Sequence, residues 1–128
     1  MLSRDLIATV IKTFFEELDN VRDGGHREEQ GNSYAGFYAA YLNKERDWFL
    51  QAPVAEITTF LADDPIYKLE MLVELMFRDA RAMTDFDMQR VICQKVLELY
   101  EVIDFRSQEF SIERMNRTVE LKKLLEQT

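Results

Sequence analysis

The sequence predicts an all-α protein of roughly five or six helices packed as antiparallel hairpins. Apolar residues recur at intervals of three and four along most of the chain, which is the spacing of one buried helix face. The chain contains four glycines and two prolines, whereas an all-β domain needs frequent turns rich in these residues. Both prolines, Pro53 and Pro65, stand at proposed helix boundaries, where proline is tolerated.

The length and composition indicate a single helical domain over residues 1–128. A chain of this size can bury roughly two thirds of its unfolded surface, so it can fold without a metal or a disulfide. With 47% hydrophobic and 31% charged residues, it has the balance of a globular protein. The segment around residues 62–65 is a possible seam between two packed subdomains, 1–63 and 64–128.

The first half is expected to hold two long helices, over residues 3–21 and 32–51. A Gly-Gly pair ends the first helix, because glycine adopts the left-handed conformation at low cost. The polar segment 24–32, which contains the only histidine, His26, is predicted to be a loop. Pro53 ends the second helix.

The second half is expected to hold a short helix over residues 53–62 and longer ones over 65–83 and 84–104. A last helix begins at Ser107 or Ser111, both of which can cap its first turn. The helix over residues 84–104 carries the densest apolar pattern, so it is expected at the centre of the core. Its apolar residues are Val91, Ile92, Val96, Leu97, Leu99, Tyr100, Val102 and Ile103.

The net charge of −8 disfavours contact with nucleic acid and with anionic membranes. The single cysteine, Cys93, excludes an intramolecular disulfide. The start of the chain has an acid, Asp5, where a signal peptide has its apolar run, and no apolar stretch reaches the roughly 18 residues of a membrane span. These features predict a reducing, cytoplasmic location.

No catalytic, cofactor-binding or metal-binding residue is predicted. The sequence therefore favours a protein without enzymatic activity. His26 stands beside Glu28 and Glu29, but a metal site needs more ligands at suitable spacing. Cys93 lies on an apolar helix face, where a cysteine behaves as a small buried hydrophobe. Four paired aspartates flank predicted helix starts and are explained by capping: Asp63, Asp64, Asp85 and Asp87.

The helix predicted over residues 32–51 carries an unusual concentration of aromatic side chains. Six of the chain's aromatics fall within an arc of roughly 120° on an ideal helix, and Glu45 lies inside that arc. Two interpretations remain open: the aromatics are core, or part of the arc is a surface that binds a partner. The candidate partner-binding residues are Tyr34, Tyr38, Tyr41, Glu45 and Trp48.

The run from Lys95 to Tyr100 follows an apolar helix and a short turn, and it resembles the second helix of a tetratricopeptide-type hairpin. The resemblance covers about the last half of the chain. It implies stacked antiparallel hairpins that bind a peptide or a protein; the alternative is an irregular helical bundle. The start Met1-Leu2-Ser3-Arg4-Asp5 and the helical tail also resemble small uncharacterised bacterial proteins, a likeness that implies no function.

Three functional hypotheses follow. The first is a non-catalytic helical module that binds a protein or peptide. The second is a homo-oligomeric structural protein, for example a homodimer, in which a second copy covers the wide apolar faces. The third is a small-ligand binder or enzyme that uses the aromatic face around Tyr41, Glu45 and Trp48.

Overall fold

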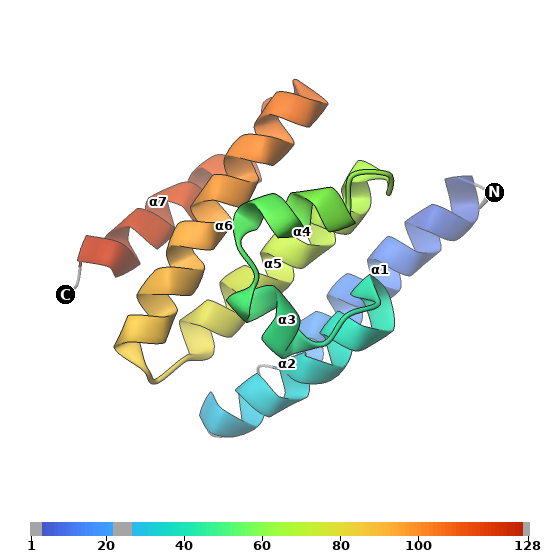
Figure 1. The fold of residues 1–128 in the computed structure, drawn as a ribbon. Coiled ribbons are helices and arrows are strands. Elements are labelled where there is room, and N and C mark those ends of the chain that lie inside the picture. Colours follow the sequence, from blue (N-terminus) through green and yellow to red (C-terminus); the bar gives the residue numbers. More distant parts are fainter. Residues whose placement is uncertain (1–3, 22–26, 127–128) are drawn as a thin grey trace.

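The computed structural model describes residues 4–21 and 27–126, and within these ranges the chain forms seven helices and no strand (Figure 1). The all-α prediction is confirmed, whereas the expected five or six helices are seven. The helices are α1 (Arg4–Val21), α2 (Arg27–Leu42), α3 (Arg46–Gln51), α4 (Val54–Phe60), α5 (Ile66–Ala82), α6 (Phe86–Ser107) and α7 (Ile112–Glu126).

The additional helix arises because the predicted helix over residues 32–51 is broken into α2 and α3. Asn43 adopts a left-handed conformation with φ of 64°, which asparagine tolerates better than most residues. Glu45 is extended, with φ of −74° and ψ of 156°, and it stands at the N-cap of α3. The prediction of one continuous helix was therefore wrong, and so was the single aromatic arc built on it.

The start of α2 also differs from the prediction. The helix begins at Arg27, so most of the predicted loop over residues 24–32 is helical. His26 lies outside the described residues. The Gly-Gly pair that was expected to end the first helix lies there as well.

The centre of the core is α5 and not α6. Figure 1 shows α5 in the middle of the molecule, and it packs against α1, α2 and α6. On α6, by contrast, Val91 of the dense apolar pattern is 51% exposed. The prediction of a central helix over residues 84–104 was therefore wrong, although Val96 within it is fully buried. The buried residues of α5 are Leu69, Met71, Leu72, Val73, Glu74, Leu75, Met76, Phe77, Asp79 and Ala80.

Side-chain caps fix the start of the two C-terminal helices. The Asp85 carboxylate accepts a hydrogen bond from the Met88 amide at 3.1 Å, so Asp85 caps α6. The Ser111 hydroxyl accepts from the Arg114 amide at 3.2 Å, which settles the choice between the two candidate serines. These caps satisfy backbone N–H groups that have no partner within the helix.

Two lysines cap helices of the first half from the second half. The Lys68 ammonium, on α5, donates to the Tyr41 carbonyl in the last turn of α2 at 2.9 Å. The Lys95 ammonium, on α6, donates to the carbonyls of Leu50 and Ala52 at 2.5 and 2.6 Å, where α3 ends. A cation at a helix C-terminus satisfies carbonyls that have no intrahelical partner. No helix among the described residues is long and apolar enough to cross a membrane.

Candidate functional site

The five predicted partner-binding residues do not form one surface. Tyr34 and Tyr38 lie in the core, with 4% and 0% exposure. Tyr41 and Trp48 are half-buried, and Glu45 is exposed. The break between α2 and α3 separates the three tyrosines from the other two residues. Of the five, Tyr41, Glu45 and Trp48 are therefore the ones that a partner could reach in this structure.

Tyr38 belongs to a buried polar network centred on Asp79. The Tyr38 hydroxyl donates to Asp79 Oδ2 at 2.7 Å, and the Arg46 guanidinium donates to both Asp79 oxygens at 2.7 and 2.9 Å. Burial, followed by the Asp79 charge, raises the pKa of Tyr38 well above its ordinary value. The hydrogen bond to Asp79 raises the pKa of Arg46. The network joins α2, α3 and α5, so its role is to fix packing.

The other aromatics of α2 pack against α1. The rings of Tyr41 and Phe14 meet edge to face with centroids 5.0 Å apart, and Phe37 stacks on Tyr41. The Tyr41 hydroxyl donates to the Glu17 carboxylate at 2.8 Å. On α3, the Trp48 indole lies under the Lys44 ammonium, 5.0 Å from the ring centroid. These contacts account for most of the aromatic concentration as packing between helices.

A second polar cluster surrounds the buried carboxylate of Glu74, on α5. Glu74 accepts hydrogen bonds from Arg78 at 2.8 Å and from Arg117, on α7, at 3.2 and 3.3 Å. Arg78 also bonds Asp19 of α1 at 2.6 Å, and the Arg117 guanidinium lies 4.6 Å from the Phe77 ring centroid. The cluster therefore connects α1, α5 and α7.

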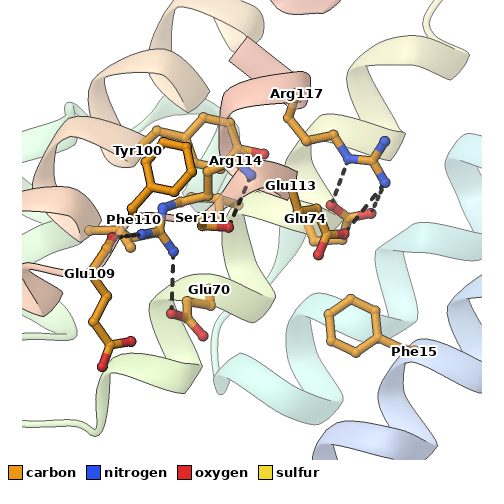
Figure 2. Close-up of a pocket in the computed structure, with 12 residues that line it drawn as sticks. Phe15, Glu70, Glu74, Tyr100, Glu109, Phe110, Ser111, Glu113, Arg114 and Arg117 are labelled. Atoms are coloured by element: carbon orange, nitrogen blue, oxygen red, sulfur yellow. Dashed lines mark hydrogen bonds and ion pairs between the residues drawn. The ribbon is translucent and has the colours of Figure 1, made fainter.

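A cavity of about 350 Å³ lies beside this cluster (Figure 2). Its walls come from α1, α5, α6, the turn at residues 108–111 and α7. Four carboxylates, two arginines and two hydroxyls supply the polar lining: Glu70, Glu74, Glu109, Glu113, Arg114, Arg117, Tyr100 and Ser111. The apolar lining consists of Phe15, Val73, Ile103 and Phe110.

The electrostatics of the cavity are set by partly buried carboxylates. Burial raises the pKa of Glu70, the nearby Arg114 lowers it, and Glu109 raises it again. The Arg114 guanidinium lies 3.8 Å from Glu70 but 2.8 Å from Asp104, and it donates to the Glu109 carbonyl at 2.6 Å. Burial also raises the pKa of the Tyr100 phenol.

Sequence reasoning missed this cavity, although one signal for it was present. Glu74 and Asp79 interrupt the wide apolar arc of α5. A charged residue inside such an arc needs a buried partner, and that requirement predicts an arginine from a neighbouring helix. The sequence could not indicate which arginine, because Arg117 lies 43 residues away along the chain.

The outer face of α7 carries an apolar stripe. Ile112, Met115 and Val119 follow the spacing of one helix face, and they are 64%, 49% and 49% exposed. Leu121, on the opposite side of the helix, is fully buried. Phe110, just before α7, is 78% exposed. We refer to Ile112, Met115 and Val119 as the α7 stripe.

Cys93 is fully buried, and burial raises the pKa of its thiol to about 11. A thiol with a raised pKa is a poor nucleophile, so its behaviour is that of a small apolar core residue. Within the part of the chain that the structure describes, no three His, Cys, Asp or Glu side chains come together as metal ligands.

Comparison of the chain with protein-family models, with curated proteins and with solved structures finds no match.

Proposed function

We propose that this protein is a non-catalytic interaction module that binds an amphipathic helix of a partner protein along the α7 stripe. The observation that carries the proposal is the exposure of Ile112, Met115 and Val119, each about half exposed or more, on one face of the last helix. The tetratricopeptide-like resemblance supports the same view, because in such arrays the next helix packs on the outer face of the previous one.

The size of the exposed apolar surface supports this interpretation. Single exposed apolar residues are ordinary, but patches larger than a few hundred Å² mark interaction sites. Ile112, Met115 and Val119 are neighbours on one helix face, so their exposed side chains form a continuous apolar surface along α7. A helix that presents apolar residues at the same spacing would fit against this surface.

The chain's charge favours a different protein over a second copy as the partner. Each copy carries a net charge of −8, so two copies repel each other at long range. A partner with a neutral or basic surface avoids that repulsion. The experiment must therefore distinguish binding of a different protein from formation of a homodimer.

The double variant Met115→Glu/Val119→Glu is expected to lose its partner. Both side chains are about half exposed, so carboxylates are tolerated in the free protein but are buried without a counter-charge in the complex. Affinity capture from the native cell, with mass spectrometry, should recover a protein with the wild-type chain and not with the variant. Ala39→Glu/Ala55→Glu, which adds the same two charges at exposed positions of α2 and α4, is the control and should retain the partner.

Two outcomes would contradict the proposal. A partner retained equally by all three proteins would place binding elsewhere. A wild-type protein that light scattering shows as a dimer, and a double variant that it shows as a monomer, would mean that the stripe is covered by a second copy.

We also propose that the aromatic face around Tyr41, Glu45 and Trp48 makes a second contact with a partner, or binds a small ligand. If a partner reaches it, Glu45→Gln and Tyr41→Phe should each weaken binding by about 1–3 kcal/mol, through loss of hydrogen bonds. The thermal midpoint should change little, because Glu45 is exposed and the Tyr41 hydroxyl bonds only the Glu17 carboxylate among the described residues. Isothermal titration with the captured partner measures both effects. A fall in thermal midpoint with unchanged affinity would assign these residues to packing.

We also propose that the protein is cytoplasmic and of bacterial source. The single cysteine supports the cytoplasmic location, because a secreted domain of this size often relies on disulfides.

A further inference from the structure

The cavity beside Glu74 has the size of a site for a small group. Its volume of about 350 Å³ is roughly ten times that of one water molecule and within the usual range of ligand sites. Figure 2 shows Glu70 and Glu74 entering from α5, with Arg114 and Arg117 entering from α7. The cavity lies on the other side of α7 from the α7 stripe, so an inference about it does not rest on the proposed function.

Tyr100 is the observation that points to a ligand. The residue is 4% exposed and lines the cavity. No hydrogen bond joins its hydroxyl to another described residue, and every fully enclosed polar side-chain atom in the described ranges has a partner. The Tyr100 hydroxyl therefore keeps some exposure, and the space that Tyr100 borders is the cavity. A buried phenol with free hydrogen-bonding capacity is suited to a polar group placed in that space.

The two arginines of the cavity already have hydrogen-bond acceptors within the protein. Arg117 is held by Glu74 at 3.2 Å and lies against the Phe77 ring. Arg114 is held by Asp104 and by the Glu109 carbonyl. Neither guanidinium is therefore free for an anion that enters the cavity.

The Glu70 carboxylate, in contrast, retains hydrogen-bonding capacity. The four carboxylates of the lining outnumber its two arginines. Glu70 is 44% exposed, and its distance of 3.8 Å to the Arg114 guanidinium is too long for a hydrogen bond. An entering anion would meet net negative charge, whereas an entering cation would be stabilised by it.

We infer that this cavity binds an organic cation, an alkylammonium or alkylguanidinium group, whose N–H groups donate to the Glu70 carboxylate and to the Tyr100 hydroxyl oxygen. The alkyl stem of the group lies against the apolar lining, to which Phe15, Val73 and Phe110 contribute. Such a group is carried both by free amines and by lysine or arginine side chains of another protein.

The test is an NMR titration of the full chain with n-butylammonium and n-butylguanidinium. We expect saturable shifts of the amides of Glu70 and Tyr100 with at least one of the two cations. Glu70→Gln should weaken binding about tenfold or more, because it removes a charge-assisted hydrogen bond, and Tyr100→Phe about fivefold. Glu101→Gln is the matched control: it removes the same charge from an exposed position of α6 outside the cavity, and it should leave the affinity unchanged.

Both variants are expected to fold, so a loss of binding has a clear meaning. Tyr100→Phe removes a hydroxyl that makes no hydrogen bond with another described residue and borders the cavity. Because the pKa of Glu70 is raised above 4.5 by burial, the folded protein binds that proton more tightly than the unfolded chain. Ionisation of Glu70 therefore costs stability as the pH rises above its ordinary pKa. A neutral glutamine should not lower the thermal midpoint at pH 7, although the change is small for a half-exposed group.

Titrations with other ligands identify the chemical class of the bound group and whether it comes from a free amine or from a protein side chain. Three results would each overturn the inference. They are shifts of the same amides with butyrate, shifts of these amides with calcium but with neither organic cation, and equal affinity of Glu70→Gln and wild type for the organic cation. Tighter binding of Nα-acetyl-lysine methylamide than of n-butylammonium would identify a protein side chain as the source. Equal or weaker binding would identify a free amine, and both of these results support the site.

Discussion

Asp79→Ala is expected to destabilise the protein by about 3–5 kcal/mol, which is the usual cost of removing one partner of a buried ion pair. The Asp79 side chain is fully buried and accepts three hydrogen bonds, one from Tyr38 and two from Arg46. Its removal leaves a partly buried guanidinium and a buried phenol without their acceptor. Typical domains have about 5–15 kcal/mol in total, so this loss removes between about a fifth and all of the stability.

Chemical denaturation followed by circular dichroism measures this loss. Asp47→Ala, which removes an exposed aspartate from the first turn of α3, is the matched control and should cost well under 1 kcal/mol beyond its effect on the helix end. The double variant Asp79→Ala/Arg46→Met should recover part of the loss, because it also removes the unpaired charge. An Asp79→Ala protein as stable as wild type would show that the network does not hold α2, α3 and α5 together.

Val96→Asp is expected to prevent folding at ordinary temperature. Val96 is fully buried within α6, and a carboxylate there costs several kcal/mol because no counter-charge is built for it. Val91→Asp is the ideal comparison, since it makes the same substitution on the same helix at a position that is 51% exposed. Thermal unfolding should leave Val91→Asp within about 1 kcal/mol of wild type. Similar stability of the two variants would mean that α6 is not packed as the structure shows.

The fold class was predictable because apolar periodicity is a local property of the chain. The helix boundaries at Pro53 and Pro65 followed from proline, and the structure has helix ends there. The break after Leu42 could not be predicted in the same way, because one asparagine in a left-handed conformation carries little signal between good helix formers.

The central helix and the cavity depend on tertiary contacts. Apolar density suggested α6 as the centre, but residues such as Val91 and Phe105 on α6 are exposed, at 51% and 82%. In contrast, α5 tolerates Glu74 and Asp79 in its core because arginines from α3 and α7 reach them. Such arginines reach their partners only once the helices are packed. Apolar periodicity in the sequence therefore could not predict the polar clusters or the cavity.

The two lysine caps have a consequence for how the chain unfolds. Lys68 and Lys95 belong to the second half of the chain, and the carbonyls they satisfy end α2 and α3 in the first half. When α5 and α6 detach, these helix ends lose their partners, and short helices are marginal in water without tertiary support. We therefore expect the two predicted subdomains, 1–63 and 64–128, to unfold in one transition, because the ends of helices in one half are completed by charges from the other.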